Sequence, residues 1–494
     1  MKRDSVGREY VRVGESRPIP KTVDWANAPS QFKLYRGCPK ILLDGPADDH
    51  ALGRLPLGRF LRDVYGLIRQ RWTAPGDVSP RGRRRVTARA KPFASNTLRP
   101  VPAGGARYPC ELYLLAGPDQ PVPAGVYHYD PAHHCLDVLR ETAPESGLSL
   151  LITVAFWKNV FKYGEFSYRL HSLDAGVVLG QSLAVASRYG LDPTVHFQFS
   201  DAALAPLLGL DPAYESVYAV VTFGPTPLAD PAPAGADGLA SQPTPPHPDS
   251  IGLYPLPAKL HQVAMQQGGG PWPKGDRPSP VPADAPVPIR SVPLPAAPLD
   301  LLDGLERRRS SKGYFRPGTL SRHQLSALLS GSMRGYLSDL GDDDDSTIRH
   351  TMLFGAVHDV EGVDSGVYYY DPVRHALEQV RAGDVSAELQ AAMTSMMFNL
   401  HQINLCFFPV AHYEPRLAAY GDRWYRVQNM EAGIIVQRLY LAAATLGLGC
   451  HTQMGFHVDA VNTLLGLGET PLTSLIHVLI APSHDPGIYY DYKI

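Results

Sequence analysis

The apolar positions of the chain fall into short continuous runs and longer helical patterns. The run Leu148–Phe156 is almost wholly apolar, which is typical of a buried β-strand. The segment His171–Tyr189 is apolar on nearly all sides and predicts a helix in the middle of a large core. Residues 52–72 carry apolar side chains at helical spacing and predict a further helix. Buried strands and helices therefore alternate along the chain.

One part of this pattern occurs twice. Gly125–Arg140 has the pattern of a hairpin with an Asp-Pro turn at its tip, and Gly366–Arg381 repeats it almost residue for residue. Beyond the hairpins, Tyr163 matches Tyr420, and the offset then stays at 257 residues, with Leu-Leu-Gly-Leu near the end of both copies. Internal similarity of this kind indicates a repeat. We predict two copies of one α+β unit.

The composition between the copies marks the domain boundaries. Residues 225–299 are rich in proline, alanine and glycine and bury too little apolar surface for a core, so we interpret them as a linker. Within it, residues 251–267 predict a short helix that packs on a domain. The expected division is an N-terminal arm (1–50), unit one (51–224), the linker (225–299) and unit two (300–494). Residues 31–43 of the arm suggest an extended segment that lies on a neighbour.

Composition and charge exclude several classes of protein. Hydrophobic residues make up 44% of the 494 residues, which is enough for two or three cores, and a net charge of −2 gives no reason to expect nucleic acid or an anionic membrane as partner. No apolar run is long enough to span a membrane, and the N-terminus lacks a signal-peptide pattern, so we expect a cytoplasmic protein. The five cysteines lack metal-ligand spacing and are predicted to be mostly buried thiols.

A glycine-rich loop is the first candidate for chemistry. Arg99-Pro-Val-Pro-Ala-Gly-Gly-Ala-Arg-Tyr-Pro109 precedes the apolar run Glu111–Ala116. Gly104 and Gly105 have no side chain to hold a ligand away, so their N–H groups suit the polar edge of a flavin or the anionic part of a nucleotide. The alternative is an ordinary surface turn.

This loop resembles that of the nitroreductase superfamily, and most closely its branch of peptide azoline dehydrogenases. In that branch an Arg-x-x-Pro-Ser-Ala-Gly-Gly-x-Tyr-Pro string leads into a Glu-x-Tyr strand and lines the ring of FMN. The resemblance implies FMN contacts from the segment that contains Arg99, Pro102, Ala103, Gly104 and Gly105. Ala103 replaces the usual serine, which removes one side-chain hydrogen bond but leaves the backbone contacts.

Nitroreductase-like units form interlocked homodimers that hold FMN between subunits, and here the required segments are divided between the copies. Only copy two has the phosphate-binding string Arg308, Arg309, Ser310, Ser311 and Lys312, and only copy one has the glycine loop. Only copy two keeps a glycine-rich turn after its central helix, with His451, Thr452, Gln453 and Gly455. Arg381 is a further candidate for a ribityl contact. The resemblance thus implies an α+β intrachain pseudodimer, each unit an antiparallel-rich sheet covered by helices, with one intact and one decayed FMN site.

Lys162 and Tyr163 match a Lys-Tyr motif that the azoline dehydrogenase branch is proposed to use for the substrate proton. Burial and a cationic neighbour such as Arg169 would lower the pKa of the lysine toward that of a useful base. Copy two has Ala419 and Tyr420 at this place, so the lysine is absent where the site is decayed. The alternative is a surface lysine that lies over an aromatic ring.

These features predict an FMN-dependent dehydrogenase that oxidises thiazoline or oxazoline rings of a modified peptide to azoles. The flavin takes the hydride, the Lys-Tyr pair takes the proton, and oxygen reoxidises the flavin, since no Rossmann motif is present. A cyclodehydratase is a candidate partner, and further oligomerisation is left open. The alternatives are an NAD(P)H-dependent nitro or quinone reductase and a non-catalytic docking scaffold. The basic segment Arg81–Arg89 is either a solvated loop or a docking site for an acidic peptide.

Overall fold

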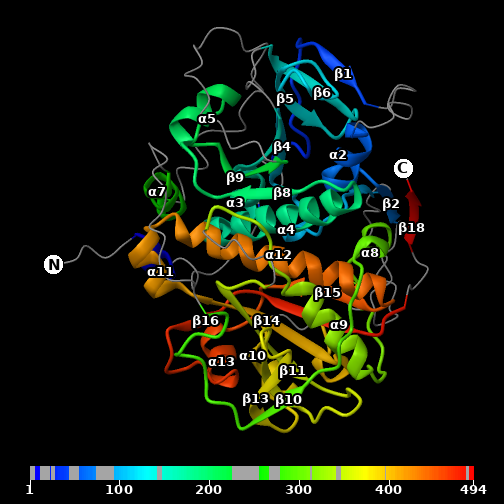
Figure 1. The fold of residues 1–494 in the computed structure, drawn as a ribbon, viewed down its shortest axis with the longest axis vertical. Helices are drawn as coiled ribbons and strands as arrows, with labels where there is room; N and C mark the ends of the chain where they lie inside the picture. Colours follow the sequence, from blue (N-terminus) through cyan, green and yellow to red (C-terminus); the bar gives the residue numbers. More distant parts are fainter. Residues whose placement is uncertain are drawn as a thin grey trace, which may run out of the picture.

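The computed structural model describes residues 6–11, 23, 28–43, 55–73, 94–141, 147–224, 255–265, 279–311, 314–340, 347–394, 397–484 and 489–493. The basic segment 81–89 and Lys312 lie outside the described residues. Two large antiparallel sheets lie on either side of a pair of long helices (Figure 1). The first sheet belongs to the N-terminal half of the chain and the second to the C-terminal half.

The first sheet has the strand order β1-β6-β5-β4-β7-β9-β8. Its strands are β1 (Lys40–Leu42), β4 (Cys110–Ala116), β5 (Gly125–Asp130), β6 (Cys135–Arg140), β7 (Leu148–Ala155), β8 (Pro193–His196) and β9 (Glu215–Phe223). The predicted buried strand is β7, which lies between β4 and β9. An interior strand packed on both faces explains why this run is nearly continuous in apolar residues.

The second sheet repeats this topology in the order β10-β13-β12-β11-β14-β17-β15, with β16 paired to β14. Its strands are β10 (Arg290–Pro293), β11 (Thr351–Val357), β12 (Gly366–Asp371), β13 (Ala376–Ala382), β14 (Leu405–His412), β15 (Gly449–Gln453), β16 (Leu472–Ser474) and β17 (His477–Ala481). Even the irregularity of the repeated hairpin recurs, since the register shifts after Val126 in one copy and after Val367 in the other. The predicted repeat and α+β fold are confirmed.

The helices cover these sheets and meet in the centre of the molecule. They are α1 (Val6–Glu9), α2 (Leu57–Tyr65), α3 (Trp157–Tyr163), α4 (Ser167–Arg188), α5 (Asp201–Leu208), α7 (Pro255–Ala264), α8 (Leu302–Arg307), α9 (Arg322–Ser332), α10 (Ser386–Ala392), α11 (Tyr413–Tyr420), α12 (Trp424–Thr445) and α13 (Val458–Leu464). Single 3₁₀ turns occur at η3 (Gly104–Ala106), η4 (Gly164–Phe166) and η5 (Leu400–Gln402). The two central helices, α4 and α12, lie side by side between the sheets (Figure 1).

Two glycines at equivalent positions allow the central helices to approach closely. A Cβ atom added to Gly176 would lie 2.6 Å from the backbone carbon of Met430, and one added to Gly433 would lie 2.8 Å from Cα of Gly176. Further along, Gly180 meets Gln437, again at an offset of 257 residues (437 − 180). Equivalent residues therefore face each other along parallel helices, and this contact explains why both copies keep the glycine of Asp-Ala-Gly or Glu-Ala-Gly.

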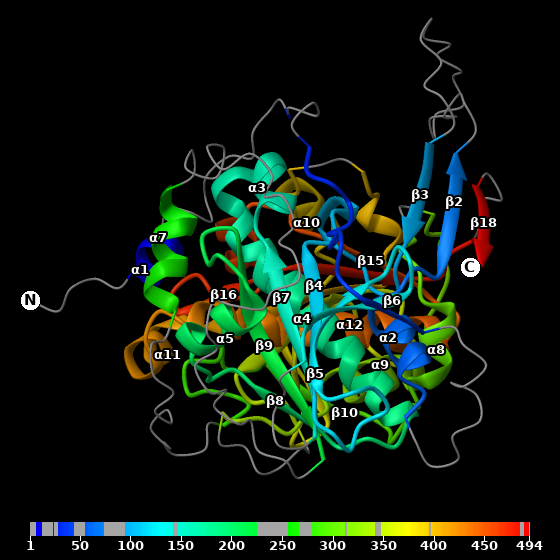
Figure 2. The same ribbon diagram turned by 90° about the horizontal axis from the view of Figure 1, so that it is seen from above.

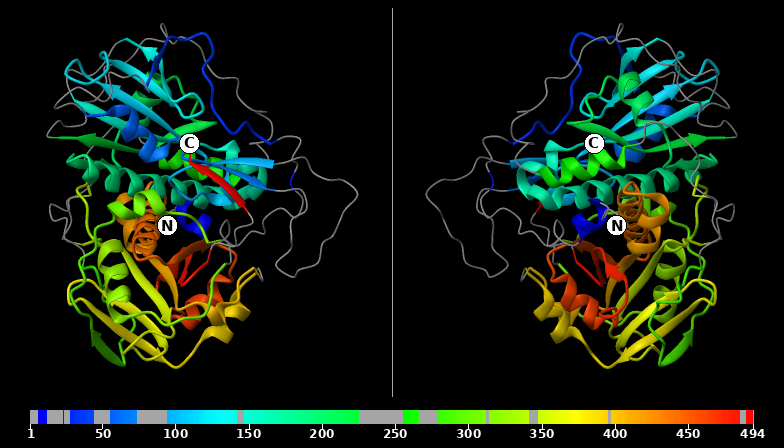
Figure 3. Two further views of the ribbon diagram at one scale, coloured as in Figure 1. Left: turned by 90° about the vertical axis from the view of Figure 1, so that its right-hand side faces the viewer. Right: turned by 90° about the vertical axis from the view of Figure 1, so that its left-hand side faces the viewer.

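A third, small sheet joins the last strand of the second copy to two strands of the first copy. The C-terminal strand β18 (Tyr489–Lys493) pairs with β2 (Arg69–Thr73), which in turn pairs with β3 (Ala94–Leu98). Figures 2 and 3 show this sheet projecting at one side of the molecule, with β18 beside the strands of the first copy. Because β3 leads directly into the glycine loop at Arg99, β18 of the second copy supports the start of that loop through its pairing with β2.

Several element boundaries differ from the sequence predictions. The helix expected over 52–72 is α2 and ends where Gly66 turns to extended geometry (ψ 179°), and part of the remainder becomes β2. The central helix begins at Ser167, before the predicted His171. In the predicted arm, Lys40–Leu42 forms β1 and pairs with β6 of the first sheet. In the predicted linker, Arg290–Pro293 pairs with β13, while α7 confirms the short helix there.

Each of the five cysteines is buried and free, as their spacing predicted. The arm, unit and linker boundaries themselves remain a prediction.

Candidate functional site

The glycine loop packs against the Lys-Tyr pair. Gly105 has a φ of 59°, and a Cβ atom at this position would lie 2.5 Å from Nζ of Lys162 and closer still to the hydroxyl of Tyr163. A left-handed backbone in so narrow a space accepts only glycine. The turn η3 begins after Ala103, whose carbonyl accepts a hydrogen bond from the N–H of Ala106 at 3.0 Å. Two segments that were predicted separately from the sequence therefore lie in contact.

A buried carboxylate holds the other glycine of the loop. The N–H of Gly104 donates to Asp174 at 3.0 Å, and the side-chain amide of Asn159 donates to the same carboxylate at 3.2 Å. Burial raises the pKa of Asp174 to about 7, although both hydrogen bonds act to lower it. The sequence marks Asp174 only through the internal repeat, in which Asp174-Ala-Gly corresponds to Glu431-Ala-Gly. Its equivalence to Glu431, at an offset of 257, was the signal that the position matters.

The environment of the Lys-Tyr pair suits proton transfer. Burial lowers the pKa of Lys162, and the positive charge of Arg107 lowers it further. Burial raises the pKa of Tyr163 to about 12, with the negative charge of Asp174 adding to the effect. The ammonium of Lys162 lies 4.9 Å from the centre of the Tyr163 ring. The lysine therefore moves toward the strength of a usable base, while the tyrosine keeps its proton at neutral pH.

The sequence predicted Arg169 as the cationic neighbour of Lys162, and this residue assignment was wrong. Arg169 is buried and donates to the carbonyl oxygens of Ser474, at 3.0 Å, and Leu475 in the second copy. Its guanidinium therefore links the two copies, and Arg107 of the glycine loop supplies the charge that acts on Lys162.

The phosphate segment of copy two contacts the glycine loop of copy one. Nη2 of Arg308 donates to the backbone carbonyl of Arg99 at 3.1 Å. Arg308 is buried, with its guanidinium 5.7 Å from the ring centre of Tyr440, whereas Arg309 is exposed. The contact between Arg308 and Arg99 joins the two halves of the divided site.

The rest of the phosphate segment lies against the turn after the central helix of copy two. Ser310 forms a parallel bridge with Cys450, and its hydroxyl lies 3.2 Å from that of Tyr440. The Tyr440 hydroxyl also accepts a hydrogen bond from the N–H of Thr452 at 3.0 Å. Nearby on this turn, the ring of His451 packs on Phe398, the amide of Gln453 lies 3.4 Å from His477, and the carbonyl of Gly455 accepts from Thr394.

Two buried guanidinium groups, each with N–H groups that have no partner, test whether these residues fit FMN. Among the described residues, Nε and Nη1 of Arg308 and Nε and Nη2 of Arg99 have no hydrogen-bond partner. Burial lowers the pKa of Arg308, so its charge is costly in this state. Guanidinium N–H groups of this kind bind phosphate oxygens well. Together with the backbone of Gly104 and Gly105, which carry no side chain of their own, they suit a ligand that carries a phosphate and a flat ring.

Arg381 is not brought to this group of residues. Its guanidinium is half-exposed and donates to Glu388 at 2.7 Å. It lies on β13, which is separated from β15 by four intervening strands of the sheet. Pro102 lies in the glycine loop as predicted, and its contact with a cofactor remains a prediction.

The equivalent turn in copy one forms hydrogen bonds with a segment of copy two. Val195, Phe197 and Gln198 correspond to Thr452, Met454 and Gly455 at the offset of 257. The N–H of Val195 donates to the carbonyl of Leu337 at 2.9 Å, and the N–H groups of Phe197 and Gln198 donate to the carboxylate of Asp339 at 3.0 and 2.8 Å. The backbone amides of this turn are therefore already satisfied, which agrees with a decayed site in copy one.

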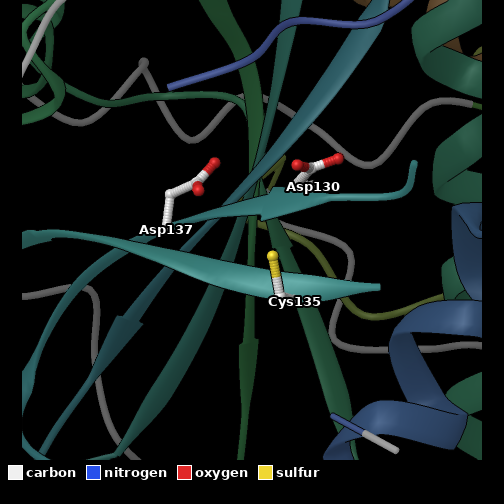
Figure 4. Close-up of side chains that lie close together, drawn as sticks. All are labelled: Asp130, Cys135 and Asp137. Atoms are coloured by element: carbon white, nitrogen blue, oxygen red, sulfur yellow. The ribbon is translucent and has the colours of Figure 1, made fainter. Parts of the chain in front are cut away.

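A cluster elsewhere has a donor set of the kind that binds metals. Asp130, Cys135 and Asp137 lie close together on the hairpin β5–β6 (Figure 4). The carboxylate of Asp137 accepts from Nδ1 of His128 at 2.9 Å and from Lys40, and that of Asp130 accepts the N–H of Ala132 at 2.8 Å. These carboxylates thus stabilise the hairpin and the strand beside it, and we assign no metal to them.

The architecture is a nitroreductase-like fold. Residues 305–478 match the model of the nitroreductase family, so the second half of the chain holds a nitroreductase-family domain. A crystal structure of a putative nitroreductase from Anabaena variabilis has the same fold, with a TM-score of 0.75 and 24% sequence identity over 97% of this chain and 100% of that one.

Three curated relatives match part of the chain. "Putative nitroreductase MJ1384" of Methanocaldococcus jannaschii is 35% identical over 120 residues, 24% of this chain and 60% of that protein. "Trifolitoxin-processing protein TfxB" of Rhizobium leguminosarum bv. trifolii is 32% identical over 136 residues, 24% of this chain and 36% of that protein. "Microcin B17-processing protein McbC" of Escherichia coli is 28% identical over 159 residues, 28% and 58% respectively. Each match thus spans less than two thirds of the relative. The predicted nitroreductase resemblance is confirmed.

In the part of the chain that the structure describes, no helix is long and apolar enough to cross a membrane.

Proposed function

We propose that the chain is an FMN-dependent dehydrogenase that oxidises azoline rings to azoles in a ribosomally made, modified peptide. The observation that carries this proposal is the packing of the Lys162-Tyr163 pair against the glycine loop at Gly105. In the same loop segment, Arg99 contacts the phosphate segment of the other copy through Arg308. A base, a loop for a flat ring and buried guanidinium N–H groups for a phosphate support the proposal of one composite site.

The reaction removes two hydrogens from the ring, one as a hydride and one as a proton. FMN, when bound, accepts the hydride. Lys162 takes the proton at Nζ from the neighbouring carbon, because burial and the charge of Arg107 favour its neutral form. Tyr163 keeps its hydroxyl proton and orients the lysine or the substrate. Asp174 holds the loop in place through the N–H of Gly104.

The choice of a peptide substrate rests on the resemblance of the loop and on two relatives. These are named as processing proteins of trifolitoxin and microcin B17. A cyclodehydratase that forms the azoline is the partner we propose. Oxygen is the oxidant we propose for the reduced flavin.

The test is reduction of the bound flavin by an azoline peptide in a single anaerobic turnover. Lys162→Ala should still bind FMN but lose about 10²–10⁴-fold in the rate of flavin reduction, the usual contribution of a positioned acid or base. Tyr163→Phe should lose less, since it is assigned only an orienting role. Tyr420→Phe, the equivalent change in copy two, is the matched control and should change little. An unchanged rate in Lys162→Ala would exclude the lysine as base.

A nitro or quinone reductase that uses NAD(P)H is the second candidate, because two of the similar proteins are named as nitroreductases. It predicts steady oxidation of NADPH in the presence of a nitroarene and no reduction of the flavin by azoline peptides. A purified protein that is colourless and cannot be reconstituted with FMN would instead support the docking scaffold.

A further inference from the structure

A second cavity lies away from the candidate FMN site. It has a volume of about 420 Å³ and lies between α3, α4, α7 and the loop 211–214. Its lining residues are Phe156, Val160, Tyr168, His171, Asp211, Pro212, Ala213, Tyr214, Pro257, Ala258, His261, Gln262 and Met265. Lys162, Tyr163 and the glycine loop do not line it. A cavity of this size and mainly apolar lining is typical of a binding site for a small organic molecule.

Three polar side chains in this wall, those of Tyr168, His171 and His261, are buried with no hydrogen-bond partner for their polar atoms among the described residues. His261 of α7 is only 5% exposed, and neither of its ring nitrogens has a hydrogen-bond partner among the described residues. Its ring contacts that of Phe156, with 4.7 Å between the centres, and stacks on Tyr218. Buried polar groups in proteins are nearly always hydrogen-bonded, so an unpartnered imidazole at a cavity indicates a missing partner.

The charge state of His261 restricts what that partner can be. Burial lowers the pKa of His261 to about 3, and the positive charge of Arg426 lowers it further. The ring is therefore neutral at physiological pH and offers one N–H donor and one bare nitrogen acceptor. The other groups with charge effects here are Asp201, which opposes Arg426, His171, which burial also keeps neutral, and Arg423, whose positive charge acts in the same direction as that of Arg426. A cationic ligand is disfavoured by Arg426, and an anion would meet the exposed carboxylate of Asp211 at the rim.

We propose that this cavity binds an uncharged aromatic ring that carries a hydroxyl or N–H group, such as a phenol or an indole, with His261 as its hydrogen-bond partner. The rings of Phe156 and Tyr168 supply aromatic walls, and Val160 and Met265 fill the remaining apolar surface. Aromatic rings prefer edge-to-face or offset contacts with such walls. This chemistry can come from a free metabolite or from a tyrosine or tryptophan side chain of a peptide.

The experiment is equilibrium binding measured by calorimetry on the full chain. The probes are p-cresol, toluene, benzoate and the peptide N-acetyl-Gly-Tyr-Gly-amide. We expect saturable binding of p-cresol, at least about tenfold weaker binding of toluene, which cannot hydrogen-bond, and no binding of benzoate. Competition between the peptide and p-cresol identifies the side chain of a peptide as a source. Binding of p-cresol alone identifies a free small molecule.

Two variants separate this site from non-specific binding. His261→Phe keeps an aromatic ring but removes both nitrogens, and it should weaken p-cresol binding by about tenfold while leaving toluene unchanged. The matched control is His401→Phe on η5, at an exposed histidine far from the cavity in the sequence. Should His261→Phe fail to fold, Ala258→Trp at the exposed rim should block the probe without altering the core. The proposal is overturned if p-cresol does not bind saturably, if toluene binds as tightly, or if neither variant weakens p-cresol.

Discussion

The strongest single perturbation of the site is the replacement of Asp174 by asparagine. The carboxyl group is buried beneath the glycine loop, and burial raises its pKa from 3.8 to about 7. Below pH 4 the group is protonated in both the folded and the unfolded chain. Between pH 4 and 7 the unfolded chain releases this proton while the folded chain keeps it, so folding stability falls as pH rises. Above pH 7 the loss is complete and constant.

The magnitude follows from the two pKa values. Their difference, about 3 pH units at about 1.4 kcal/mol each, amounts to about 4 kcal/mol. Asparagine carries no charge and can still accept the N–H of Gly104, and the unpaired side-chain oxygen of Asn159 is available for its amide group after a flip. Asp174→Asn should therefore unfold with a free energy close to that of the parent at pH 4 and about 4 kcal/mol higher at pH 8.

The assay is urea unfolding of the flavin-free protein, followed by circular dichroism at several pH values. Of the expected gap between variant and parent, about 2 kcal/mol should develop between pH 5.5 and pH 7. Asp459→Asn, on the exposed surface of α13, controls for the general loss of one negative charge and should show no such gap. A gap between Asp174→Asn and the parent that is the same at pH 5.5 and pH 8 would refute the assignment of a buried, mostly neutral carboxyl group.

Three further predictions concern the composite site. Gly105→Ala should displace the Lys-Tyr pair and slow flavin reduction at least as much as loss of the lysine. The control is Gly104→Ala, whose Cβ would lie 3.4 Å from Leu170 and which should fold normally. Equal effects of the two variants on flavin reduction would contradict the loop geometry. Arg308→Ala should weaken FMN binding by up to about 3 kcal/mol, measured by fluorescence titration, and more than Arg309→Ala at the exposed neighbour, since a buried charge-assisted bond is lost. Flavin released on denaturation should amount to one FMN per chain, and two would contradict a decayed second site.

Much of the fold is predictable because its signals are local or repeated. The apolar run of β7 and the all-round apolar pattern of α4 follow from burial on every side. The shared offset of 257 residues between Gly176 and Gly433 marks a helix contact that no single copy reveals. By contrast, the pairing of β18 with β2 joins residues more than 400 positions apart, from Lys493 to Arg69, and nothing in either strand indicates the other.

Only part of the candidate site was predictable, because some of its contacts join distant residues and leave no local signal in the sequence. Motifs identify Gly105, Lys162 and Arg308, because each has a residue type that the chemistry requires. They do not identify Arg107 as the charge beside the lysine, since that depends on how the loop turns after its left-handed glycine. Contacts made by a side chain across elements have no sequence period, and these are the contacts that set the pKa values of the site.

The two equivalent acids show how one repeat gives two different outcomes. In copy one, Asp174 accepts the N–H of Gly104 and so holds the glycine loop at the site. In copy two, Glu431 accepts hydrogen bonds from Thr351 and, at 3.4 Å, from the hydroxyl of Tyr336. Tyr336 and Asp339 both belong to residues 332–340, which lie where copy two would carry a glycine loop and have a different sequence.

That segment is fixed from both ends. At one end, Arg438 of the central helix donates to the carbonyls of Arg334 and, at 3.3 Å, of Gly335. At the other end, the carboxylate of Asp339 accepts hydrogen bonds from the N–H groups of Phe197 and Gln198. In a symmetric dimer of identical subunits, any residue that fills one cofactor site also fills the other. A carboxylate at this position would then prevent cofactor binding at both sites. Two copies in one chain remove this constraint, so the carboxylate of Asp339 can bind the turn of copy one while the glycine loop, which is the corresponding segment of copy one, offers no such group to the equivalent turn of copy two.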